Sequence, residues 1–187
     1  MLYLSKGVLC KNSATDNLRV ARGNKIIELS ESESKIWLLG RFQLAVTNEK
    51  EDFAIIKQLS DKGLMEYEDS YTNTAKYFIL TRCICCPTIT YRIQKPLFGQ
   101  EKTIMKWLAN AGLRLSVAEL IYLIEHKIKP ENSLFYTENT QVLVETIYTQ
   151  NTIYDNILEN QMLDANCREE VVQLLLRLLS KKRIVML

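Results

Sequence analysis

Three cysteines within four residues are the first place to look for chemistry in this chain. The stretch reads Cys83-Ile84-Cys85-Cys86-Pro87. Thiolates bind zinc, but a zinc site needs about four ligands arranged as a tetrahedron. Side chains alternate along a strand, so Cys83 and Cys85 would share one face and Cys86 would lie on the other. No second cysteine or histidine pair stands at zinc-finger spacing. We therefore expect these thiols to fill a core and to bind no metal.

The other residue types give no basis for catalysis. His126 is the only histidine, and it stands late in an expected helix, where a cation interacts favourably with the helix C-terminus. A catalytic role would need a paired nucleophile or acid, and the sequence names none. Gly-rich phosphate loops, nucleophile elbows and His-Glu metal motifs are also absent from the sequence. We expect a protein without enzymatic activity and without a cofactor.

Basic residues gather in two segments that could contact nucleic acid. One segment surrounds an expected hairpin and the other an expected wing. Together they give six candidate nucleic-acid-binding residues: Arg19, Arg22, Lys25, Lys76, Arg82 and Arg92. Wing arginines can enter a DNA minor groove. Mixed charge on a solvated surface that keeps a protein soluble gives the same pattern, so the sequence leaves both interpretations open.

The total charge is close to neutral. The chain of 187 residues has a formal net charge of +2. Residues 1–95 carry 14 Lys and Arg against 11 Asp and Glu, and residues 96–187 carry 10 against 11. A strong electrostatic footprint for nucleic acid is therefore absent, although these totals are compatible with a local basic face.

Composition also bears on the compartment. No apolar run approaches the ~18 residues of a membrane span, so we expect no membrane partner. The first seven residues lack the basic start and long apolar core of a signal peptide. Five cysteines make an odd number, and nothing points to export, so we expect reduced thiols and a cytoplasmic location.

The elements that position these residues follow from the apolar pattern. Residues 2–10 are mostly apolar β-formers and predict strand structure. Residues 18–21 and 25–29 flank Arg22-Gly23-Asn24, which is a hairpin turn signal. Farther along, residues 64–68 and 77–86 predict a second hairpin with the outline of a wing.

A capping pattern opens four apolar-periodic segments. In this pattern a Ser or Asn accepts from the backbone N–H three residues on, where a Glu reaches back to the backbone N–H of that Ser or Asn. The four pairs are Ser30/Glu33, Asn48/Glu51, Ser116/Glu119 and Asn166/Glu169. We expect a helix after each of them, and further helices at residues 101–111, 138–148 and 152–162.

Two of these helices end in a basic turn that runs into a short apolar strand. The two stretches are Leu59-Ser60-Asp61-Lys62-Gly63-Leu64-Met65 and Leu179-Ser180-Lys181-Lys182-Arg183-Ile184-Val185. Helix, basic turn and strand, once in each half, outline a winged-helix module. The sequence thus predicts an α+β, mostly helical fold of two winged-helix-like halves with short β-hairpins. We place the domains at residues 1–95 and 96–187.

The order of elements resembles that of tandem winged-helix proteins over most of the chain. In that superfamily the helix before the wing usually enters the DNA major groove with its N-terminal residues against the bases. The resemblance implies double-stranded DNA binding in transcriptional regulation. However, the two candidate helices begin Asn48-Glu49-Lys50-Glu51-Asp52 and Asn166-Cys167-Arg168-Glu169-Glu170. Their carboxylates would face phosphates, so the charges argue against what the architecture favours.

A second resemblance covers roughly residues 2–67. The stretch from Leu18 to Ser30, then Lys35-Ile36-Trp37-Leu38-Leu39 and the ending Leu59-Ser60-Asp61-Lys62-Gly63-Leu64, resembles the peptide-recognition domains similar to the pyrroloquinoline quinone peptide chaperone. That family binds a leader peptide by adding it as a strand to a sheet edge. The resemblance implies a peptide- or protein-recognition module, which is our alternative to DNA binding. This chain departs from the family by its expected wing and its whole second half.

The apolar residues near the C-terminal end suggest a homodimer. The expected helix from Asn166 has an apolar arc wider than one core contact requires. Ile184-Val185-Met186-Leu187 then forms an apolar strand, and an unpaired apolar edge is usually covered. A second copy of the chain would cover it, although the strand could instead pair inside its own domain.

Overall fold

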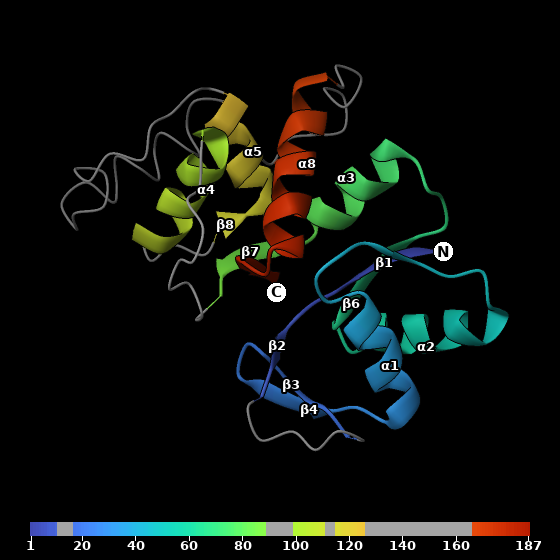
Figure 1. Ribbon diagram of the computed structural model, residues 1–187. Coiled ribbons are helices and arrows are strands. Elements are labelled where there is room, and N and C mark those ends of the chain that lie inside the picture. The colour runs from blue at the N-terminus through green and yellow to red at the C-terminus, as the bar shows by residue number, and fades with distance from the viewer. Residues whose placement is uncertain (11–16, 89–98, 111–114, 126–165) are drawn as a thin grey trace.

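The computed structural model describes residues 1–10, 17–88, 99–110, 115–125 and 166–187, and these residues form an α+β fold. Their strands make three small antiparallel sheets, with strand orders β5-β1-β6, β2-β3-β4 and β8-β7-β9. In Figure 1 the helices of the second half lie above the β8-β7-β9 sheet, and the first half lies below and beside that sheet. The sheet of β2, β3 and β4 is at the bottom of the view. The α+β class predicted from the sequence is confirmed.

The first half of the chain runs from β1 to β6. Its sheets are joined by two helices that pack together. The elements are β1 (Leu2–Ser5), β2 (Val8–Leu9), β3 (Arg19–Arg22), β4 (Lys25–Glu28), α1 (Glu31–Leu39), β5 (Ala45–Val46), α2 (Lys50–Asp61) and β6 (Met65–Glu68).

The second half runs from α3 to β9. Its helices surround α8, whose apolar side chains are buried against α3, α4 and α5. The elements are α3 (Asn73–Thr81), β7 (Ile84–Pro87), α4 (Gly99–Asn110), β8 (Leu115–Ser116), α5 (Val117–Glu125), α8 (Asn166–Ser180) and β9 (Ile184–Met186). None of these described helices is long and apolar enough to cross a membrane.

The two halves repeat one strand arrangement. In each, the first strand is central, and the strands that follow a helix flank it on both sides in antiparallel pairing. The register agrees as well. Ser5 in β1 pairs with Met65, and Pro87 in β7 pairs with Ile184. The sequence predicted a repeat of helix, turn and strand only. The structure shows that the repeat also includes the way in which the strands of each half pair.

The turn that follows the helix is the same in both halves. After α2, the N–H groups of Gly63 and Leu64 donate to the carbonyls of Ser60 and Leu59 at 2.7 and 2.8 Å. After α8, Lys182 N–H donates to Leu179 O at 2.8 Å, and the next N–H reaches one carbonyl farther back. This double hydrogen bond closes a helix on a residue with positive φ. Gly63 has φ 69, whereas Lys182 has φ 55 without being glycine.

Strand β1 belongs to two hydrophobic cores at once. Leu2 and Leu4 are buried with the helices of the second half. Met1 and Tyr3 are buried with α1 and α2. Because side chains alternate along a strand, one short strand forms the wall between both cores. The chain is therefore packed as one body through β1.

The predicted wing is wrong. Residues 77–86 were expected as a strand, but α3 covers residues 73–81 and only Ile84–Pro87 is strand. The Thr72 hydroxyl caps α3 by accepting from Ala75 N–H at 3.1 Å. Ala75, Ile79 and Leu80 then enter the core on one helix face. Burial of these side chains on one helix face outweighs their preference for strand structure, because β propensity depends on tertiary context.

The capping pattern holds once and fails once. Ser30 and Glu33 form both hydrogen bonds of the predicted box at the start of α1. At α2, the capping residue is Glu49 and no side chain caps the helix. Asn48 instead accepts from the Tyr71 hydroxyl at 2.8 Å. The side chains of Glu119 and Asn166, needed for the other two boxes, lie outside what the structure describes.

The remaining predictions from the sequence concern the domain boundary, two further helices and the dimer, and their outcomes differ. The boundary at residue 95 and the helices expected at 138–148 and 152–162 lie outside the described residues. Residues of α3 and β7, assigned by sequence to the first domain, pack in the core of the second half. The wide apolar arc of α8 is covered within the chain, and β9 pairs with β7. The two features that suggested a homodimer are thus satisfied internally, and the dimer stays a prediction.

Positive φ at Lys182 gives the first testable prediction. Lys182→Gly and Lys182→Ala remove the same side chain, but only glycine adopts φ 55 without a steric penalty. We expect Lys182→Gly to be more stable than Lys182→Ala by about 1 kcal/mol in urea unfolding. Equal stabilities would contradict the left-handed turn at this position.

Candidate functional site

The hairpin of β3 and β4 presents the most exposed strand of the first half. Arg22 pairs with Lys25 across the turn Gly23-Asn24, and Gly23 has φ 56. That φ fits the first central position of a type II′ turn, which suits the twist of two strands. The hairpin predicted from Arg22-Gly23-Asn24 is therefore confirmed. Strand β4 lies at the edge of its sheet, bonded to β3 alone among the described strands.

The backbone groups of β4 alternate between β3 and the open edge. Residues flanking a two-residue turn form a hydrogen-bonded pair, so Lys25 and Ile27 direct their N–H and C=O groups to β3. The next bond in this series joins Leu29 N–H to Leu18 O at 2.8 Å. Ile26 and Glu28 therefore direct their backbone groups away from β3. Among the described residues these groups form an unpaired edge that another strand could join.

The side chains of β4 separate in the same way. Ile27 packs partly buried against the core of the first half. Ile26 is on the opposite face and is 58% exposed. Ala21 and Arg19 of β3 are the cross-strand neighbours of Ile26 and Glu28. The outer face thus offers one apolar and one acidic side chain along the open edge.

The six candidate basic residues do not form one surface. Arg19 and Lys25 are exposed on the hairpin. Arg22 lies over Gly63, where an added Cβ would overlap its guanidinium, and it faces the C-terminal end of α2. Arg92 lies outside the described residues.

The remaining two basic residues, Lys76 and Arg82, belong to α3 and its C-terminal end. In Figure 1 the start of α3 lies well away from the hairpin, whereas Arg82, at the end of α3, acts together with Arg22 on the pKa of Cys83. Lys76 donates to Asn73 Oδ1 at 3.1 Å, and Asn73 in turn donates to Glu169 at 2.9 Å. Arg82 forms ion pairs with Glu68 at 2.9 Å and Glu66 at 3.9 Å. Arg82 is therefore paired with acidic side chains of β6, although its own side chain is 49% exposed.

Lys6 is a buried lysine that binds Glu66, one of the two acidic partners of Arg82. The Lys6 ammonium, in a side chain only 5% exposed, donates to Glu66 Oε1 at 2.7 Å. It also approaches Arg82 O at 3.5 Å. The Lys6 backbone accepts from the Trp37 indole at 3.0 Å. Sequence reasoning missed Lys6, although a lysine inside the mostly apolar stretch of residues 2–10 was a signal that could have been followed.

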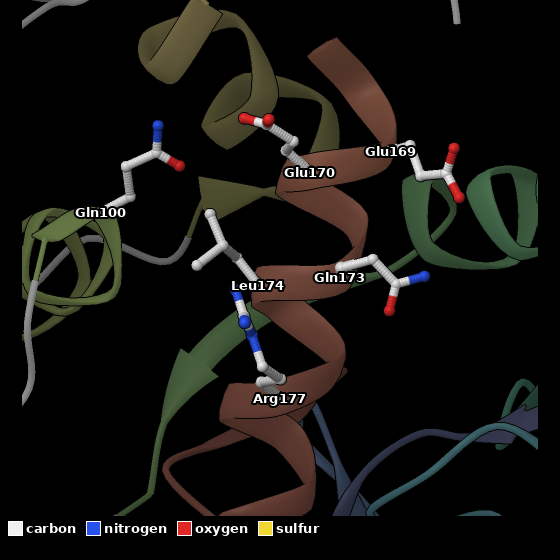
Figure 2. Close-up of a pocket in the computed structure, with 6 residues that line it drawn as sticks. All are labelled: Gln100, Glu169, Glu170, Gln173, Leu174 and Arg177. Carbon is white, nitrogen blue, oxygen red and sulfur yellow. The ribbon is translucent and has the colours of Figure 1, made fainter. Parts of the chain in front are cut away.

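A groove of about 660 Å³ crosses the exposed side of α8, and Figure 2 shows its lining residues. Glu170 and Arg177 point to the side where Gln100 of α4 lies, whereas Glu169 and Gln173 point toward α3. Arg177 lies 4.0 Å from Glu101. The polar groups diverge to both sides of the helix, so they do not converge on a small ligand.

The three clustered cysteines are buried. Cys83 donates its S–H to Ile79 O at 3.2 Å, and burial raises its pKa to about 12. Burial also raises the pKa of Cys85 well above the usual value. A thiol in such surroundings is inert and behaves as a small apolar side chain. The expectation that these residues fill a core is confirmed. His126 lies outside the described residues, and within the described ranges no three His, Cys, Asp or Glu residues are grouped to hold a metal.

The chain was compared with protein-family models, with curated proteins and with solved structures. No match was found in any of the three comparisons. Inferences about function therefore rest on the geometry of the chain itself.

Replacing one or the other residue of the Lys6–Glu66 pair should lower the free energy of unfolding by unequal amounts. Glu66→Gln leaves a buried ammonium without a carboxylate, and we expect it to lower the free energy of unfolding by about 3 kcal/mol. Lys6→Met leaves Glu66 still beside Arg82, so we expect a smaller loss. Urea unfolding measures both. A larger loss for Lys6→Met would show that the ammonium is not the buried group that needs its partner.

Burial of the cysteines predicts their reactivity. In a chain with Cys10 and Cys167 changed to Ser, we expect no reaction with an aromatic disulfide reagent at about pH 8 until urea unfolds the protein. The raised pKa keeps Cys83 and Cys85 as thiols at that pH. Native-state labelling at the rate of free cysteine would contradict the buried placement.

Proposed function

We propose that this protein is a non-enzymatic recognition module that binds an extended peptide along the open edge of β4. The observation that carries the proposal is the unpaired edge at Ile26 and Glu28. Added strands gain affinity from main-chain hydrogen bonds and specificity from alternate side chains. The exposed Ile26 supplies an apolar contact on one face of such an added strand.

The order of elements in the first half supports the same proposal. Four strands precede α1, in which Ile36 and Trp37 are buried. Helix α2 then ends in the turn at Gly63. The resemblance to peptide-recognition domains similar to the pyrroloquinoline quinone peptide chaperone implies this order and a peptide added at the sheet edge. The second half of the chain is a departure from those domains and has no role in the proposed contact.

DNA binding is the second candidate function. It is favoured by Arg22 and Lys25, which pair across the hairpin turn and place two cations together. Two observations weigh against it. Arg82 is held by Glu66 and Glu68, and the first turn of α2 carries Glu51 and Asp52, which would repel phosphates.

A proline at Ile26 tests the peptide proposal. Proline removes the outward N–H, but no bond to β3 is lost, and edge strands tolerate it. Peptides of about 12 residues selected from a random display library on the full chain serve as probes. We expect Ile26→Pro to weaken their binding at least about tenfold, the loss of one or two hydrogen bonds. In hydrogen exchange, bound peptide should protect the amides of Ile26 and Glu28.

Two controls accompany this test. Ile26→Thr keeps the backbone donor and should weaken binding less than Ile26→Pro. Ile84→Ala removes a different exposed isoleucine and should have no effect. Selected peptides that bind Ile26→Pro as well as wild type would overturn the proposal. Random duplex DNA bound at low salt and lost in Arg22→Gln and Lys25→Gln, with no effect of Ile26→Pro, would establish the second candidate instead.

A further inference from the structure

Two cations from opposite halves of the chain meet on one aromatic ring. Arg41 follows α1, and its guanidinium carbon lies 4.6 Å from the centre of the Phe42 ring and 5.4 Å from that of Trp37. Lys182 follows α8, and its Nζ lies 5.6 Å from the same Phe42 ring. Cations stack favourably on aromatic faces. The Phe42 ring therefore has one positive charge from each half of the chain within 5.6 Å of its centre.

Neither cation has an acidic partner among the described residues. Across the described ranges, the ion pairs of the chain include neither Arg41 nor Lys182. Arg41 Nε is buried and finds no hydrogen-bond acceptor among the described groups. Burial lowers the pKa of Arg41 from its usual value, and no carboxylate contributes to this shift. A desolvated guanidinium without a counter-ion is an unfavourable arrangement.

The helix ends beside these cations do not take up their donors. A cation at a helix C-terminus can bond the last carbonyls. The carbonyls of Trp37, Leu38 and Leu39 already accept from other groups, namely Ser5 Oγ, a backbone N–H and Gln43 Nε2. At α8, the carbonyls of Leu178 and Leu179 accept from the backbone of the turn. These carbonyls therefore do not bind the side chains of Arg41 and Lys182, and the ammonium of the exposed Lys182 remains available to a ligand.

The backbone of Lys182 adopts a left-handed conformation that residues other than glycine disfavour. The equivalent residue of the first half is Gly63, which adopts positive φ readily. A lysine at φ 55 costs free energy that glycine would not. Strained residues of this kind gather at functional sites. The strain places an ammonium over Phe42 that glycine could not provide.

We propose that Arg41 and Lys182, on the ring of Phe42, form a binding site for a phosphate group. A divalent oxyanion supplies several acceptor oxygens, which suits one guanidinium and one ammonium together. It also neutralises two charges that have no acidic partner in the part of the chain that the structure describes. The site lies between the two halves and is distinct from the β4 edge, so it does not depend on the peptide proposal.

Titration of the full chain with inorganic phosphate, at constant ionic strength, tests the site by calorimetry. We expect saturable binding with one phosphate per chain. Arg41→Gln and Lys182→Gly should each raise the Kd about tenfold or more, as expected for the loss of a charge-assisted hydrogen bond. Lys182→Gly is the sharper variant because glycine suits φ 55, so the fold is retained. Acetate, with one charge, should bind more weakly than phosphate.

The control is Lys57→Gln, which removes one positive charge from an exposed lysine of α2. It should leave the Kd for phosphate unchanged. Binding that does not saturate at millimolar phosphate would overturn the proposal. So would a Kd that Lys57→Gln raises as much as Lys182→Gly, since the effect would then follow total charge rather than the site on Phe42.

Discussion

The fold depends on a buried ammonium at the place where its two halves meet. Lys6 lies directly after β1, and its Nζ is bonded to Glu66 of β6 and close to the carbonyl that follows α3. Its own carbonyl holds the Trp37 indole of α1. A buried ion pair adds little net stability over an apolar contact, but its geometry is demanding. Its consequence is therefore one of specificity: β6, α1 and the end of α3 must all be in place for Lys6 to be satisfied.

Gly7, the next residue, extends this junction to the other end of the chain. Its N–H donates to Met186 O of β9 at 2.8 Å, at the edge of the sheet of the second half. Gly7 has φ 104, and an added Cβ would lie 2.6 Å from Val20. Only glycine allows the chain to pass between β9 and β3 at this point. Lys6 and Gly7 thus add polar contacts between the repeated halves to the apolar contacts of β1.

Local signals explain what the sequence predicted correctly. The Ser30 box, the turn at Gly63 and the hairpin at Gly23 each involve residues a few positions apart. Residues 77–81 were misread because their β-forming side chains are buried by a helix capped at Thr72, and only tertiary packing decides between the two. The ion pairs of Arg82 join residues that are not neighbours in sequence, so these pairs could not be foreseen. The open edge at Ile26 was reachable from the sequence, since the hairpin was predicted and a strand-adding partner was weighed.

The double role of β1 bears on how this chain reaches its fold. Leu2 and Leu4 are covered by the helices around α8, although their sequence neighbours complete a different core. During synthesis, the strand made first must wait with one face exposed until residues near the other end of the sequence emerge. Contacts between residues so far apart in sequence slow folding and prolong the exposure of apolar surface. The same strand that unites the two cores therefore keeps apolar surface exposed until both ends of this sequence have been made.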